Sequence, residues 1–313
     1  MQRSNLLGFG IIAMCLLTLA VLKPVAPVAG QGTDHKLYLP LVIRAGSASN
    51  ALVIDHRHTD LSRIPAYWLN QAKQRMFHLA HTSHGGQILS GMNALYQQDN
   101  KYAFCTLEAP PNHPPTELPT ACAAGQVRVY DGQPGYTGHS YESYITPDLY
   151  WETDDGVTRT HIVADTGLYH DSMWSWCGQQ SDNSEATVQQ YLDTMRGFQT
   201  AYLNMRYILM TGHTDGGGAT LARNNNMVRQ YAQTYNMVLF DFEDLEKYAP
   251  DGSGPYDNDG EGYCQWCAAW CNTHDCGVLP DNCDHSHPFA CKLKAQAYWW
   301  MLARLAGWDG VSP

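Results

Sequence analysis

Three short segments of this 313-residue sequence combine the residue types that nucleophilic catalysis needs. The first is residues 81–86, HTSHGG, in which a serine stands where a predicted strand gives way to a predicted helix. A serine on such a turn exposes its hydroxyl, and the N–H groups of a helix N-terminus stabilise negative charge beside them. Ser83 is therefore a candidate nucleophile, although a serine that only caps the helix gives the same pattern.

The second segment, residues 177–181, has the sequence CGQQS and also follows a predicted strand. Gly178 and Gln180 can offer N–H groups to an oxyanion. An ordinary polar turn before a capped helix is the alternative interpretation. His213 follows a later predicted strand, and we expect it either to line the same pocket or to lie in a flexible loop.

The third segment, residues 284–288, has the sequence DHSHP and precedes the last predicted helix. Histidine is the side chain best suited to accept a hydroxyl proton near neutral pH, and a nearby aspartate can orient its imidazole. Asp284 with His287, or with His285, is therefore a candidate acid–base pair. Two histidines separated by one residue are also typical of metal ligands, and a histidine that caps the helix is a third interpretation.

The elements that must position these segments alternate along the chain from about residue 60. Apolar spacing predicts helices over residues 62–74, 85–96, 154–164, 184–203, 221–235 and 290–306. It predicts strands over residues 76–81, 127–130, 172–177, 206–211 and 237–242. This order predicts an α/β fold, a three-layer αβα sandwich with a mostly parallel sheet. Functional residues of such a sheet lie at the carboxyl ends of its strands, where the candidate segments fall.

With an early serine, amide donors in the middle and a late Asp-x-x-His, the chain resembles the SGNH (GDSL-like) hydrolases over roughly residues 75–306. The resemblance implies a flavodoxin-like αβα fold and a serine esterase that acts through an acyl-enzyme. It makes Ser83 the nucleophile, His287 or His285 the base, and Asp284 the residue that orients the imidazole. No cofactor is implied.

The family's oxyanion donors would correspond to Gly178 with Gln180 and to a glycine of the segment 132–138, either Gly135 or Gly138. Thr82 and Gln180 stand where the family usually has Asp and Asn. The expected substrate is a small-molecule ester or an acylated polysaccharide. The departures leave room for a non-catalytic glycan-binding protein on the same scaffold.

A second alternative is a metal-dependent hydrolase built on histidines. Its ligands would be His81, His84 and His213, together with His285 or His287. In the serine hydrolase, by contrast, we expect His84 and His213 to line the substrate pocket. A net charge of −11 excludes a nucleic-acid binder that relies on a basic face.

The N-terminal 30 residues have the pattern of a secretory signal: Arg3, an apolar run over residues 6–22, and small residues after it. We expect cleavage near residues 26–32, and an uncleaved segment would be the one membrane contact. Residues 31–50 are interpreted as a linker and 51–313 as the hydrolase domain. Its Cys-rich insertion, residues 248–283, contains the acidic stretch 257–261, which predicts an acidic surface loop or, less favoured, a calcium site.

The cysteines agree with export. Six of the ten cysteines fall within residues 264–291, and behind a secretory signal this density predicts disulfides rather than a zinc site. Cys105 and Cys122 bracket a proline-rich loop that a disulfide between them would close. Without Cys15 of the signal the count is odd, which makes Cys177 the expected free thiol.

Overall fold

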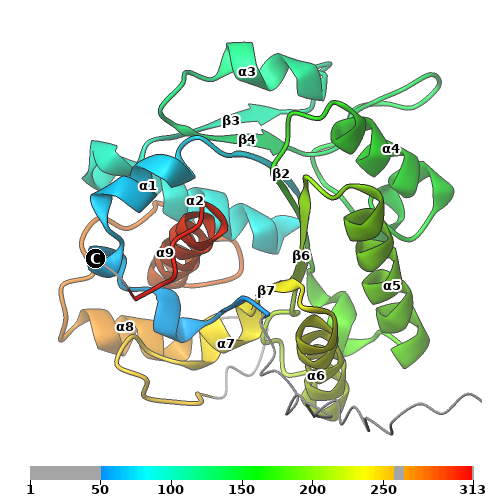
Figure 1. Ribbon diagram of the computed structural model, residues 1–313. Helices are drawn as coiled ribbons and strands as arrows, with labels where there is room; N and C mark the ends of the chain where they lie inside the picture. Colours follow the sequence, from blue (N-terminus) through cyan, green and yellow to red (C-terminus); the bar gives the residue numbers. More distant parts are fainter. Residues whose placement is uncertain (1–50, 257–263, 312–313) are drawn as a thin grey trace, which may run out of the picture. The chain divides into compact units, whose positions relative to one another are not determined.

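The computed structural model describes residues 51–256 and 264–311 of the chain. Their strands form one parallel sheet in the order β1-β7-β6-β5-β2-β4-β3 (Figure 1). The strands are β1 (Val53–Ile54), β2 (Met76–His81), β3 (Phe104–Glu108), β4 (Val127–Asp131), β5 (Asp171–Ser175), β6 (Arg206–Met210) and β7 (Val238–Phe240).

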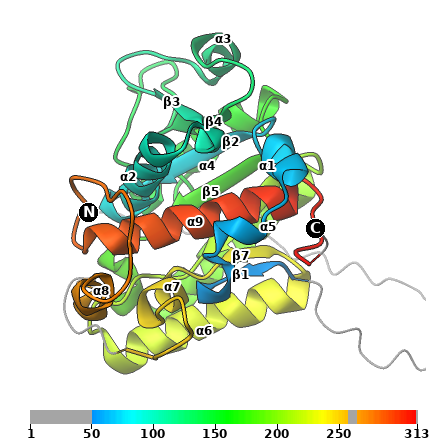
Figure 2. The same ribbon diagram turned by 90° about the vertical axis from the view of Figure 1, so that its left-hand side faces the viewer.

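Helices cover both faces of the sheet, so the predicted three-layer αβα sandwich is confirmed. The helices are α1 (Ala66–Ala72), α2 (Ser83–Gln98), α3 (Leu118–Ala121), α4 (Asp154–Asp165), α5 (Glu185–Ala201), α6 (Gly218–Tyr235), α7 (Phe242–Lys247), α8 (Gln265–Cys271) and α9 (Pro288–Leu305). Helices α1, α2 and α9 lie on one face and α4, α5 and α6 on the other (Figures 1 and 2). Helices α7 and α8 pack against α9.

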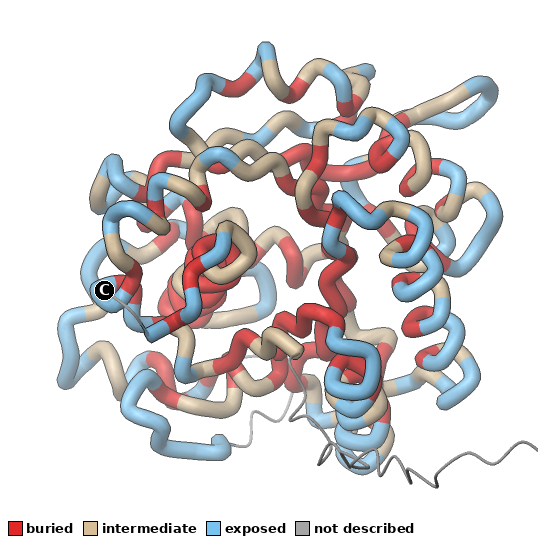
Figure 3. The backbone as a smooth tube through the Cα atoms, viewed as in Figure 1, coloured by how far each residue is buried: buried red, intermediate tan, exposed pale blue. Residues whose placement is uncertain are grey.

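The core lies along the central strands and along α9 (Figure 3). Every residue of β5 is buried, as expected for a parallel strand that is covered on both faces. Helix α9 is apolar nearly all round and 14 of its 18 residues are buried. It packs closely on α2, where a Cβ on Gly91 would meet the Cys291 carbonyl oxygen at 2.0 Å. This contact holds the start of α9 close to α2.

Most predicted elements are confirmed to within a few residues, and the errors have physical reasons. Strand β3 was missed because it is an edge strand with little burial, and its sequence FCTLE lacks a continuous apolar run. Strand β1 is only two residues long. Helix α8 lies inside the segment predicted as an irregular insertion. The density of cysteines, which form disulfides within and next to the helix, is typical of a loop and hid the helical pattern.

Four disulfides join the paired cysteines: Cys105–Cys122, Cys264–Cys267, Cys271–Cys276 and Cys283–Cys291. The predicted closure of the proline-rich loop and the stapled insertion are therefore confirmed, and Cys177 is the free cysteine of the described residues. Such a set is typical of extracellular proteins.

Three sequence predictions lie outside the described residues: the secretory signal, the linker over residues 31–50, and the acidic stretch 257–261. Among the helices in the described ranges, none has the length and apolar character that a membrane crossing would need.

Candidate active site

The carboxyl ends of β2 and β5 meet at the point where the fold changes direction. The two strands are neighbours, with Leu79 opposite Met173 in the parallel register. The chain leaves β2 into α2 on one face of the sheet and reaches α5 on the other face after β5 (Figure 1). In open α/β sheets, ligands bind in the crevice that forms at such a switch point.

A cavity of about 310 Å³ lies at this crevice. Its lining comes from four separate segments of the chain: His84, Cys177, Gly178, His213, Asp215 and His285. The structure thus brings together four of the residues predicted from the sequence, and it adds a thiol. We call Cys177 with its three histidines, His84, His213 and His285, the imidazole–thiol cluster.

The thiol of Cys177 lies at the centre of this cluster. Its Sγ is 3.3 Å from Nδ1 of His84 and 3.5 Å from Oγ of Ser83. A ring nitrogen of His213 lies within 4.8 Å of the sulfur. The rings of His84 and His213 stack with centroids 3.6 Å apart, and the ring of His285 lies 5.2 Å from that of His84. Three imidazoles therefore stand in a row beside one thiol.

The surroundings of Cys177 favour its ionised form. Burial opposes ionisation, but hydrogen bonds from His213, Ser83 and the Gly178 N–H outweigh it and lower the pKa of the thiol to about 7. The lowered pKa increases the share of thiolate near neutral pH, and the thiolate is the nucleophilic form of cysteine. Burial also opposes the charge on His213, yet the contact with Cys177 and the charge of Glu246 raise the pKa of its imidazole.

The surroundings of His84 disfavour the charged form of its imidazole. Burial, His213 and Lys294 lower the pKa of its imidazole to about 2, so this ring is neutral. Its Nδ1 faces the sulfur, while its Nε2 is buried and has no hydrogen-bond partner in the part of the chain that the structure describes. Two stacked imidazoles with opposite pKa shifts are the arrangement that separates an acid–base group from a neutral neighbour.

His285 reaches the cavity through an unfavourable backbone conformation. Its φ of +59° lies in the left-handed region, which costs a residue with a Cβ roughly 1–2 kcal/mol. The surrounding turn holds it there, since the Gln87 amide donates to the Asp284 carbonyl and the Cys283–Cys291 disulfide ties the turn to α9. Strain of this kind concentrates at functional sites.

Several predicted residues lie elsewhere. Asp284 is exposed, and its carboxylate accepts a hydrogen bond from Asn282 at 2.8 Å. His287 is the N-cap of α9, and its Nδ1 accepts from the Phe289 N–H at 3.1 Å. The structure therefore does not bring Asp284 and His287 together as an acid–base pair in the cavity.

The remaining oxyanion candidates are also outside the cavity lining. Gly135 and Gly138 lie in the loop after β4, which an antiparallel bridge between Gln133 and Glu142 closes. Gln180 is buried against Gly212, and its Nε2 has no partner within the described ranges. Gly178 alone of the four lines the cavity.

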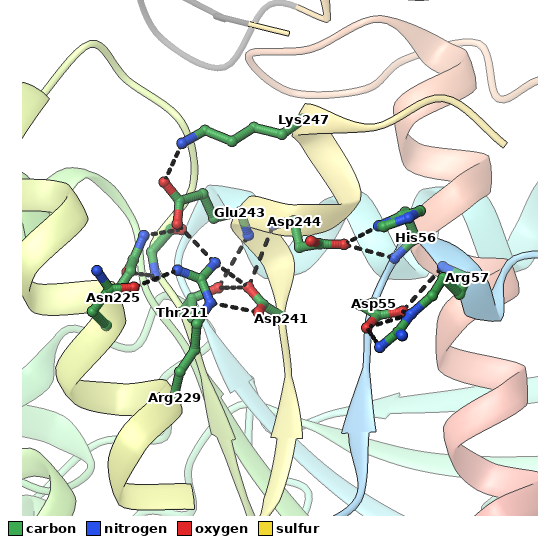
Figure 4. Close-up of polar contacts among 12 residues, drawn as sticks. Asp55, His56, Arg57, Thr211, Asn225, Arg229, Asp241, Glu243, Asp244 and Lys247 are labelled. Atoms are coloured by element: carbon green, nitrogen blue, oxygen red, sulfur yellow. Dashed lines mark hydrogen bonds and ion pairs between the residues drawn. The ribbon is translucent and has the colours of Figure 1, made fainter. Parts of the chain in front are cut away.

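A second charged region lies at the same edge of the sheet, beyond β6 and β7 (Figure 4). Arg229 makes a two-pronged contact with Asp241 at 2.6 and 2.7 Å, and it reaches Glu243 at 2.8 Å. Lys247 donates a hydrogen bond to the other carboxylate oxygen of Glu243, at 2.6 Å. We call these four residues the paired network, because each of its charges has an opposite partner.

The two regions differ as candidate metal sites. His56 and Asp244 beside the paired network already bind each other at 2.5 Å. In the imidazole–thiol cluster, His84, Cys177 and His213 have the donor types that zinc takes. Their ligand atoms lie within 4.8 Å of one another, so an ion bound there would replace the contacts that the two imidazoles make with the Cys177 thiol. His81 is turned to Asp131, 2.9 Å away, and does not line the cavity.

In comparisons with protein-family models, with curated proteins and with solved structures, no match to this chain was found. The SGNH resemblance therefore stays a prediction, and the site has to be interpreted from its own geometry. Sequence reasoning missed Cys177 as a functional residue. Two signals were available in the sequence. Cys177 stands at the end of a predicted strand, and the odd number of cysteines makes it the expected free thiol.

Proposed function

We propose that this protein is an exported hydrolase that cleaves acyl esters through a covalent acyl-enzyme, with Cys177 as the nucleophile. The observation that carries the proposal is the Cys177 thiol beside two stacked imidazoles in a cavity at the switch point of the sheet. A thiol with a lowered pKa beside a histidine is the arrangement of an activated nucleophile. The reaction class is the one that the SGNH resemblance predicts, with sulfur in place of the serine oxygen.

The proposed reaction begins with the thiolate attacking the carbonyl carbon of the ester. The oxyanion faces the N-terminus of α2, whose first N–H groups have no partner inside the helix, and the hydroxyl of Ser83. Protonated His213 then gives its proton to the departing alkoxide, which leaves a thioester on Cys177. A water molecule gives a proton to neutral His213 as it attacks the thioester. This step releases the acid and restores the thiolate–imidazolium pair.

The size and position of the cavity support a small acyl group. Its volume of about 310 Å³ is at the lower end of the range for ligand pockets. The alcohol portion of the substrate, whether a small alcohol or a polysaccharide, would remain outside it. Export is supported by the predicted signal and by the four disulfides, which form in oxidising compartments.

One contact favours a second candidate, in which Ser83 is the nucleophile as the resemblance implies. Its Oγ lies 3.5 Å from the sulfur of Cys177, so a thiolate there can accept the serine proton. The two candidates share the site and the reaction but differ in the atom that carries the acyl group.

The deciding experiment compares Cys177→Ala with Ser83→Ala in turnover of p-nitrophenyl acetate, with circular dichroism as the control for folding. We expect the cysteine variant to lose turnover, and we expect trapped acyl-enzyme to carry its acetyl group on the peptide that contains Cys177. An acetyl group on the peptide that contains Ser83, with turnover lost in both variants because the Cys177 thiolate is then the base, would establish the second candidate instead.

Two further measurements address the alternatives from other classes. Chelators should leave turnover unchanged, and stoichiometric metal in the active protein would contradict the thiol mechanism and support a metal-dependent hydrolase. Specific glycan binding by a protein that neither turns over esters nor is alkylated at Cys177 would instead support a binding protein on this scaffold.

A further inference from the structure

A fully buried ion pair joins the elements that carry the imidazole–thiol cluster. Lys294 of α9 lies 2.6 Å from Glu246 of α7, and each side chain is only 1% exposed. Removing two charges from water is costly, and an apolar pair of similar size is often as stable. Stability alone therefore does not account for this ion pair, and its contacts point to another role.

The Glu246 end holds the loop that presents His213. One carboxylate oxygen of Glu246 accepts hydrogen bonds from both the N–H and the hydroxyl of Thr214, at 2.7 and 2.8 Å. Thr214 directly follows His213, and its carbonyl in turn receives the Nδ1 of that histidine at 2.9 Å. This leaves the other ring nitrogen, Nε2, for Cys177. The negative charge of Glu246 also supports the imidazolium form of His213.

Lys294, at the other end of the ion pair, is connected to the two segments that carry His84 and His285. Its ammonium group donates to the Gln87 side chain, whose amide N–H donates to the carbonyl of Asp284, next to His285. Gln87 lies three residues after His84, on the same side of α2. The positive charge of Lys294 opposes protonation of His84. One chain of contacts thus runs from the loop after β6, through two buried charges, to α2 and the turn before α9.

We propose that the Lys294–Glu246 ion pair is the positioning element of this site, which fixes the His213 loop, α2 and the His285 turn relative to the thiol of Cys177. The two residues touch no substrate and act through their neighbours. The proposal rests on the proposed function in one respect, that Cys177 is the reacting group. It goes beyond that function in naming what keeps the thiol activated.

The test replaces both charges at once, because a single substitution would leave one buried charge unpaired and strongly destabilise the fold. The double variant Glu246→Met/Lys294→Met, made in the full chain, is compared with wild type in the rate of iodoacetamide alkylation of Cys177 against pH. Peptide mass spectrometry reports the alkylation at this one residue. Circular dichroism and thermal melting establish that the variant is folded.

We expect the midpoint of the alkylation profile to move upward by roughly half a pH unit or more, because His213 is no longer held against the sulfur. Glu246→Gln/Lys294→Met keeps an oxygen that can accept from Thr214, so its shift should be smaller. The matched control is Lys292→Met. Lys292 is also buried on α9, at 5% exposure, but it binds Gln98 and the Cys276 carbonyl, away from the cluster. Its profile should match that of wild type.

The readout separates this proposal from the proposed function, because alkylation needs no turnover. A shifted midpoint in the folded Met/Met variant supports the positioning role even if the wild-type protein hydrolyses no ester. A folded Met/Met variant whose profile superimposes on that of wild type overturns it, whatever the activity. A shift of equal size in Lys292→Met also overturns it, since any buried charge on α9 would then have the same effect.

Discussion

The imidazole–thiol cluster and the paired network both lie at the carboxyl ends of the strands of one sheet. They differ in how far their buried polar groups have hydrogen-bond or ion-pair partners. In the paired network, Asp241 and Glu243 are buried and each contacts Arg229 directly. In the cluster, Nε2 of His84 is buried without a partner among the described residues, and His285 has a strained backbone. Groups whose hydrogen bonds are complete hold structure, whereas incomplete groups around a cavity are available to a substrate.

The largest expected effect tests the cluster. Cys177→Ala should lower kcat by roughly 10⁴-fold or more, about 5.5 kcal/mol of barrier, because it removes the atom that bonds to the acyl group. The same change should alter the free energy of unfolding only slightly, since the imidazole of His213 keeps the charge of Glu246 and its contact with the Thr214 carbonyl. Turnover of p-nitrophenyl acetate and urea unfolding check the two halves. Strong destabilisation would mean that the cluster is a structural region like the paired network.

The next effect tests the paired network. Arg229→Met leaves buried Asp241 without its cationic partner and leaves Glu243 with Lys247 alone, and it should lower the free energy of unfolding by ~3–5 kcal/mol. Arg223→Met is the matched control, because Arg223 pairs with Glu185 and the two side chains are 43% and 66% exposed. That change should cost less than ~1 kcal/mol. Urea unfolding measures both. Equal costs would show that burial does not distinguish these pairs.

A smaller effect concerns the pH dependence of the thiol. The thiolate is the form that iodoacetamide alkylates, so the rate at Cys177 rises with pH through the pKa of the thiol. We expect the midpoint near pH 7 in the folded protein, because the pKa is lowered to about 7, and near the ordinary cysteine value of about 8.5 in urea. A folded midpoint as high as the unfolded one would show that the imidazoles do not activate Cys177.

The smallest effect compares two residues in the left-handed region, His285 and Asn236. His285→Gly should raise the free energy of unfolding by about 1 kcal/mol while it lowers turnover, since glycine adopts this conformation without strain but brings no imidazole to the cavity. Asn236 is the C-cap of α6 and does not line the cavity. Asn236→Gly should therefore leave turnover unchanged. Unaltered turnover in His285→Gly would remove His285 from the site.

The sequence by itself determined the layered α/β fold, because the apolar runs of buried strands and the helical spacing between them are local patterns. It also placed His84, Gly178 and His213 just after strands, where parallel topology gathers them, and His285 just before the last helix. The disulfide-rich insertion and the free thiol followed from counting cysteines. The pairing within the insertion did not, since six cysteines allow 15 pairings.

Only the tertiary structure decided which of these residues meet. Asp284 and His287 have the spacing of an acid–base pair, but the turn of residues 284–287 directs one to solvent and uses the other as a helix cap. Cys177 gains its role from His84 and His213, which are 93 residues before it and 36 residues after it. No local pattern encodes such contacts, because the packing of α2, the β6 loop and α9 against one another sets the distances between their side chains.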